Sequence, residues 1–206
     1  MRFPKIKSTR PAQEQKDLYD FELAQRILSG QNGVIGQVSS LSGARKAIRT
    51  AEKTMRPLPH EHGVFINDKG QVLHATNKKE DSINVEEILG RNQLTNSFGT
   101  HNHPSSVAEG TFGMEDHILT HRNMMKGLRS VDYNSTMSMH RTNKTSIVPN
   151  EIENRYKKAY RTVSNEHIRK QMTDPNYYDE EFGWKIHKEL SDNLNEKTWK
   201  KPYHEK

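Results

Sequence analysis

The sequence predicts an α+β protein: a small mixed β-sheet core flanked by helices, with extra helices at both ends. Strand-like alternation lies in the middle of the chain, and helical spacing lies on either side of it. Only 31% of the 206 residues are hydrophobic and 28% are charged, which favours a compact core with polar surroundings. We therefore expect an N-terminal helical extension (1–57), a core (58–148) and a C-terminal polar helical extension (149–206).

Two amphipathic helices are expected before the core. Residues 12–29 place apolar side chains on one stripe and are followed by Gly30, a typical stop. A glycine-containing break, 30–36, comes next. Residues 40–55 repeat the helical spacing, and the prolines at 57 and 59 end this second helix.

The core begins with a β-hairpin over 63–76, turning at 68–70. A short helix at 85–89 has an N-cap at Asn84 and a stop at Gly90. A strand over 94–101, a loop over 104–113 and a helix over 114–126 follow. Residues 130–141 alternate as one half-buried strand, and residues 145–148 are expected to pair with it.

The C-terminal region shows two helical stripes, separated by Asp174-Pro-Asn. The stripes are Ile152, Tyr156, Tyr160 and Val163, then Phe182, Ile186, Leu190 and Leu194. Such stripes usually face a core, so these helices are expected to cover the core. An interaction arm is the alternative.

Charge and composition restrict the partners. The formal net charge is +6, and basic residues crowd the ends at 1–16 and 197–206, so we expect weak non-specific affinity for nucleic acid at most. No membrane span or secretory signal is visible, which predicts a cytoplasmic protein with no membrane partner. Export or delivery without a signal stays open. The sequence has no cysteine, so any metal must be held by histidine and carboxylate.

The segment Thr100-His-Asn-His-Pro-Ser105 carries the strongest chemical signal. Residues two apart on a strand point the same way, so His101 and His103 present both imidazoles to one face. Ser97 and Gly99 on that face are small and are expected to leave a pocket open. A catalytic zinc site needs a third protein ligand and room for water.

Asp116 and Glu61 complete the candidate site. Asp116 opens the helix expected at 114, where the helix dipole favours a carboxylate, and would be the third ligand of a single zinc ion. Glu61 stands at the start of the first core strand. Hydrolysis of an amide needs a base that takes a proton from water and passes it to the leaving nitrogen, and Glu61 is the candidate.

This arrangement of Glu, then His-x-His-Pro, then an Asp opening a helix resembles the JAB/MPN (JAMM) zinc metalloproteases, and is closest to RadC-like and phage or mobile-element members. The resemblance covers about residues 59–148 and implies a deaminase-like layout. It implies a zinc-dependent peptidase or isopeptidase acting on a protein or peptide, with Glu61 as base and His101, His103 and Asp116 as zinc ligands.

The sequence departs from the family pattern in two ways. Twelve residues separate His103 from Asp116, and Gly113 replaces the family's serine, which helps to hold the oxyanion. Ser105, Ser106 or Thr111 could take that role. His117 and His121 share a helix face and are expected to be exposed or, for His117, close to the site. His60 and His62 are expected at the surface.

Three other functions remain open at this stage. The first is a phage or mobile-element effector or toxin with a JAB-like core. The second is a metal-dependent nuclease, suggested by the basic charge and the His-Asn-His string. The third is a non-catalytic binding module, which agrees with Gly113 at the serine position.

Overall fold

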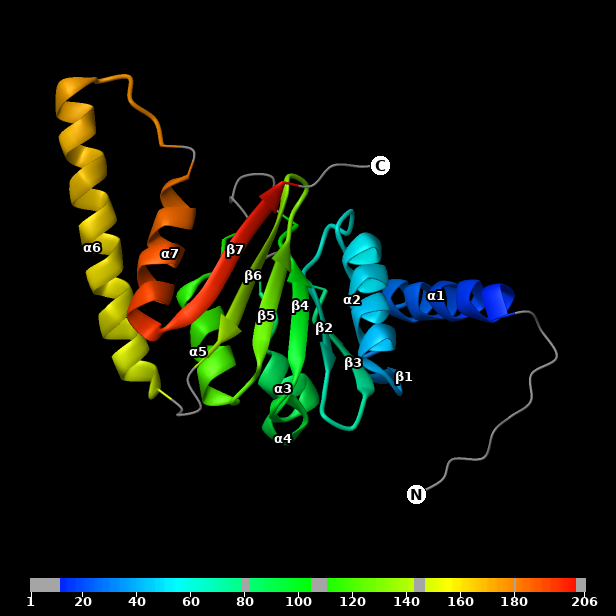
Figure 1. Ribbon diagram of the computed structural model, residues 1–206. Helices are drawn as coiled ribbons and strands as arrows, with labels where there is room; N and C mark the ends of the chain where they lie inside the picture. Colours follow the sequence, from blue (N-terminus) through cyan, green and yellow to red (C-terminus); the bar gives the residue numbers. More distant parts are fainter. Residues whose placement is uncertain (1–11, 79–81, 105–110, 143–146, 180, 203–206) are drawn as a thin grey trace.

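The computed structural model describes residues 12–78, 82–104, 111–142, 147–179 and 181–202, apart from the side chains of 12–17. In this part of the chain, helices flank one open seven-stranded sheet of order β1-β3-β2-β4-β5-β6-β7 (Figure 1). Neighbouring strands are antiparallel except β4 and β5, which are parallel. The predicted α+β class with a mixed sheet is confirmed.

The strands have the following bounds: β1 Gly33–Gln37, β2 His62–Ile66, β3 Gln71–Thr76, β4 Phe98–Asn102, β5 Gly127–Val131, β6 Ser135–Arg141 and β7 Glu196–Pro202. The helices are α1 Ala12–Leu28, α2 Leu41–Met55, α3 Val85–Leu89, α4 Arg91–Leu94, α5 Met114–Arg122, α6 Pro149–Thr173 and α7 Phe182–Leu194. Among the described helices, none has a stretch long and apolar enough to cross a membrane.

Helices α1 and α2 pack on one face of the sheet. Most of the apolar stripe expected for α2 is buried there. The stripe expected for α1 was wrong in part, because its Leu18, Phe21 and Leu28 are exposed and the helix buries Leu23 and Ile27. Leu23, Ile27, Ala47 and Ile48 are buried there in one cluster with residues of β1, β2 and β3. The hydroxyl of Ser40 accepts a hydrogen bond from the Gly43 N–H and so caps α2.

The opposite face carries a second apolar cluster and the candidate site. Phe65, Leu128 and Met139 are buried on it together with residues of α3 and α4, and Trp184 of α7 packs against the cluster. Helix α3 begins where expected, because Asn84 Oδ1 accepts a hydrogen bond from the Glu87 N–H. A third cluster joins α6 and α7 and is contacted by Ile118 of α5.

Gly63 and Gly99 allow Phe65 to lie across the sheet. A Cβ at Gly99 would be 2.4 Å from Cδ1 of Phe65, and one at Gly63 would be 2.8 Å from its Cε2. The small residues were predicted to leave an open pocket. That prediction was wrong for Gly99, because the Phe65 ring fills the space above it.

Several element predictions need correction. Residues 130–141 form two strands, β5 and β6, because Asp132 Oδ1 accepts hydrogen bonds from Asn134 N–H and Ser135 N–H and so makes a turn. The stretch 94–101 splits into the end of α4 and strand β4. The pairing expected at 145–148 falls partly on 143–146, outside the described residues.

The terminal regions also contribute strands that the sequence reading missed. Strand β1 lies in the predicted glycine-containing break and pairs with β3. Strand β7 lies in the region predicted to be entirely helical and pairs with β6 along its whole length. The sheet is therefore larger than the small core expected, and both ends of the chain extend it.

We predict that Gly99→Ala lowers the free energy of unfolding by about 1–3 kcal/mol, because the new methyl group must displace the Phe65 ring. Urea unfolding measures this change. In a Phe65→Leu background, which removes the ring, the same substitution should cost clearly less. An equal cost in both backgrounds would contradict the packing described here.

Candidate metal centre

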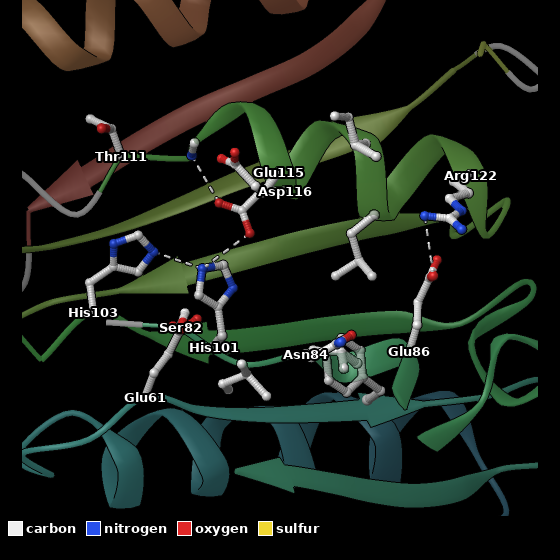
Figure 2. A pocket seen from close by; sticks show the side chains of 16 residues that line it. Glu61, Ser82, Asn84, Glu86, His101, His103, Thr111, Glu115, Asp116 and Arg122 are labelled. Atoms are coloured by element: carbon white, nitrogen blue, oxygen red, sulfur yellow. Dashed lines mark hydrogen bonds and ion pairs between the residues drawn. The ribbon is translucent and has the colours of Figure 1, made fainter. Parts of the chain in front are cut away.

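Strand β4 delivers two imidazoles to one point. Alternation along the strand places His101 and His103 on the same face, at its carboxyl end, and their Nε2 atoms lie 2.7 Å apart (Figure 2). His101 is buried, at 4% exposure. Its ring also makes a hydrogen bond to the backbone of Arg129 on β5. A contact of this kind fixes the orientation of a metal-ligating histidine.

Helix α5 brings the carboxylate to the same point. Asp116 lies in the first turn, and its Oδ1 is 3.4 Å from Nε2 of His101. Its Oδ2 accepts a hydrogen bond of 2.9 Å from the Gly113 N–H at the helix start. One oxygen therefore caps the helix while the other faces the histidines, as Figure 2 shows.

The three residues fit a zinc ion. Their ligand atoms all lie within 4.8 Å of one another, and two imidazoles with one carboxylate are a donor set that zinc accepts. Zinc bonds of ordinary length in a tetrahedron place ligand atoms about 3.3 Å apart. The 3.4 Å between His101 and Asp116 agrees with this spacing, and the two histidine nitrogens, which are 2.7 Å apart, would need to separate by about 0.6 Å.

Burial sets the protonation of the site. Burial lowers the pKa of His101 to about 4. Burial, together with electrostatic repulsion from His101, also lowers the pKa of His103 to about 4. Burial also raises the pKa of Asp116, against the opposing influence of His103. Both imidazoles are therefore neutral near pH 7, which is the form that binds metal.

Glu61 lies beside the histidines. The β2–β4 register pairs Gly63 with His101, and continuing it by two residues sets Glu61 opposite His103 on the same face. Both Glu61 and His103 line the cavity. In Figure 2 the Glu61 side chain extends toward the imidazoles. Glu61 therefore lies at the same cavity as the three candidate ligands.

Asn102 holds the Glu61 segment in place, a role that the sequence reading missed. Its Oδ1 accepts a hydrogen bond of 2.7 Å from the His62 N–H, and its Nδ2 donates one of 3.0 Å to the His60 carbonyl. The two contacts clamp the residues on either side of Glu61. Asn102 itself is fully buried, on the face of β4 opposite the histidines.

A cavity of about 730 Å³ lies in front of the three candidate ligands. Apolar side chains from β2, α3 and α5 line much of it, including Phe65, Val85 and Leu119. Thr111 and Gly113 form part of the rim beside Asp116. Of the residues considered for the oxyanion, Thr111 is thus at the cavity, whereas Ser105 and Ser106 lie outside the described residues.

His117 and His121 are not exposed, contrary to one of the readings of the sequence, because β7 covers them. Both are fully buried and hold the carboxylate of Glu196: His117 Nδ1 and His121 Nε2 each lie 2.9 Å from one of its oxygens. His117 Nε2 is also 3.0 Å from Nδ1 of His187 on α7. This buried cluster of three histidines and Glu196 joins α5 to α7 and β7. One of its members, His117, directly follows Asp116 in the sequence.

The surface position expected for His62 was wrong, because its ring faces β3 instead of solvent. His62 is buried, and its Nδ1 lies 3.0 Å from Nε2 of His74. The two rings stack with centroids 5.2 Å apart. His74 Nδ1 is in turn 2.6 Å from the carbonyl of Gln31, so this pair packs the start of β2 against β3.

Comparison of the chain with protein-family models, with curated proteins and with solved structures found no match.

We predict that Glu196→Gln destabilises the protein by about 2–3 kcal/mol, because a neutral amide cannot serve both buried histidines as the carboxylate does. Thermal or urea unfolding at pH 7 reads out the change. Glu22→Gln, at an exposed position of α1, is the matched control and should change stability by less than about 0.5 kcal/mol. Equal stability of the two variants would show that the cluster contributes nothing.

The buried histidines predict a loss of stability in mild acid. Burial lowers the pKa of His62 to about 4 and that of His187 to about 3. Unfolding restores values near 6.5, so the unfolded chain binds more protons below that pH. Stability is complete above pH 6.5 and falls toward pH 4, by on the order of 1 kcal/mol per pH unit for each histidine.

The change of unfolding free energy with pH is measured by urea unfolding in the presence of a chelator. The pH range is about 7.5 to about 4.5, which lies within about two units of the ordinary histidine pKa. His62→Gln should make this change with pH smaller. Glu196 does not act in this window, because its two histidines hold its pKa at about 2 despite burial, and its contribution is lost only below its ordinary value of 4.5. A stability independent of pH would contradict the account.

Proposed function

We propose that this chain is a zinc-dependent peptidase or isopeptidase that hydrolyses an amide bond. The observation that carries the proposal is the convergence of His101, His103 and Asp116, with Glu61 lining the same cavity. The resemblance of the motif to the JAB/MPN metalloproteases supports the same function. One zinc ion per chain is expected.

The zinc ligands, Glu61 and Asn102 have separate roles in the proposed reaction. Zinc, when held by His101, His103 and Asp116, would lower the pKa of a water molecule and polarise the substrate carbonyl. The carboxylate of Glu61 would accept a proton from water and return it to the leaving nitrogen. Asn102 is a positioning residue, since it fixes the backbone on both sides of Glu61.

The cavity favours a peptide-like substrate. Its apolar lining of Phe65, Val85 and Leu119 suits an aliphatic side chain next to the scissile bond. Gly113 offers no hydroxyl to the oxyanion, so Thr111 is the side chain at the rim that could donate one. We expect slow turnover for this reason.

A second candidate is a metal-stabilised binding module without catalysis. Two observations favour it: Gly113 stands at the serine position, and Asp116 already caps α5 through Oδ2. The effector or toxin and nuclease readings gain no specific support from the site.

We predict that the purified chain binds one zinc ion, and that His101→Ala or Asp116→Ala weakens binding at least about a hundredfold, because each removes one of three protein ligands. Isothermal titration after removal of metal measures the affinity. Glu115→Gln is the control at the neighbouring exposed position and should bind as the unaltered chain does. Equal zinc affinity in all variants would place the ion elsewhere.

We predict that Glu61→Gln abolishes cleavage while it preserves folding and zinc affinity, because the amide cannot accept the proton. Asn102→Ala should lower kcat more than it raises KM. Cleavage of an internally quenched peptide library and of lysine-linked diubiquitin is the assay. Cleavage by Glu61→Gln at the unaltered rate would refute the mechanism, and zinc binding with no cleavage of either substrate would favour the binding module.

A further inference from the structure

On the face of the sheet opposite the metal centre, two hollows meet beside α2. One has a volume of about 540 Å³ and the other about 640 Å³, and they share Leu41, Ala44, Ile66, Asn67 and Lys126. We call this continuous depression the α2 groove. It is separate from the cavity at His101, since Ile66 and Phe98 point to the α2 side of the sheet, whereas Phe65 and His101 point to the other.

The groove has an apolar base and a basic rim. Ala44, Ile48, Ile66 and Phe98 lie in its lining, and Leu41 at its edge is 69% exposed. Arg45 and Arg49, one turn apart on α2, stand on one side, and Lys126 stands on the other. Among the residues that the structure describes, the 540 Å³ hollow has no acidic residue in its lining, and Asp68 is the one acidic residue in the lining of the other.

These three cations are available to a partner. All three are exposed, and within the described parts of the chain none of them makes an ion pair. Arg129, which also lines the groove, differs because its guanidinium is held 2.6 Å from Glu52. The rim therefore carries unneutralised positive charge above an apolar surface.

We propose that the α2 groove binds an acidic peptide segment that also carries aliphatic side chains. Carboxylates would meet Arg45, Arg49 and Lys126, and an aliphatic side chain would enter between Leu41 and Ile48. The chain's own ends are rich in lysine and arginine and would be repelled, so the occupant is a different molecule.

The lining favours a peptide over a nucleic acid. Single-stranded nucleic acids are held by aromatic platforms on which bases stack. Here the two aromatic rings in the lining, Phe98 and His140, are stacked on each other with centroids 5.4 Å apart, so each ring has one face already covered. The remaining apolar lining is aliphatic, which suits amino-acid side chains.

Fluorescence anisotropy tests the proposal with three labelled peptides of equal length, built from repeats of Glu-Leu-Glu-Ser, Gln-Leu-Gln-Ser and Glu-Ser-Glu-Ser. The first should bind at least about tenfold more tightly than the other two, because it alone offers both charge and an apolar side chain. A chelator is present, so the result is independent of the proposed zinc chemistry. Equal binding of all three, or no binding, would overturn the proposal.

Two double variants separate the groove from general charge. Arg45→Glu with Arg49→Glu should weaken binding of the first peptide at least about tenfold. Lys158→Glu with Arg161→Glu, at exposed positions of α6, changes the net charge equally and should leave binding unaltered. Leu41→Ser should weaken binding without any change of charge.

Equal weakening by both double variants would overturn the proposal. A second result would also overturn it: oligothymidylate binds more tightly than the first peptide, and this binding is lost in the Arg45→Glu, Arg49→Glu variant. The groove would then be a nucleic-acid surface.

Discussion

The parallel pairing of β4 with β5 is the constraint on which the candidate metal centre depends. Parallel neighbours cannot be joined by a tight hairpin and need a crossover connection. In this chain the crossover contains α5, which begins at Met114, after His103 in sequence. The connection that satisfies the sheet therefore also brings Asp116 back over the carboxyl end of β4, where the histidines are.

The antiparallel partner of β4 supplies the other half of the centre. Strand β2 starts where β4 ends, so its first residues lie beside His103. Asn102 then uses its amide to bind the backbone at His60 and His62. One strand thus carries both histidines on one face and the clamp for Glu61 on the other.

The C-terminal region is built into this arrangement and supports it. Glu196 begins β7 and is buried against two histidines of α5, and His187 of α7 contacts one of them. An isolated carboxylate buried in this way would be strongly unfavourable, but paired with two histidines it fixes α5 against its neighbours. The helix that carries Asp116 is therefore held by its own hydrogen bond at Gly113 and by the last strand of the sheet.

Local patterns in the sequence were enough to predict much of the site. Alternation put His101 and His103 on one face, and a helix start put Asp116 in its first turn. Strand β7 could not be predicted, because it is a polar edge strand in which the hydrophobic residue, Trp199, is exposed and the partly buried positions are Thr198 and Lys200. The Glu196 cluster and the Asn102 clamp join residues far apart in sequence, so no local pattern reports them.

At Gly99, the local sequence pattern led to a wrong structural prediction. A small residue beneath the histidines was read as space for a pocket, but at Gly99 the space is taken by Phe65. A glycine in a strand signals that something approaches closely, without saying whether it is a ligand or a neighbouring side chain. Only the packed structure distinguishes the two.

Anomalous diffraction at the zinc edge, from crystals of the zinc-loaded chain, tests the central claim most directly. The account predicts one strong peak between Nε2 of His101, Nε2 of His103 and Oδ1 of Asp116, each at about 2.0–2.2 Å from the ion. The absence of a peak there, or a peak at the His117–His121–Glu196 cluster instead, would contradict it.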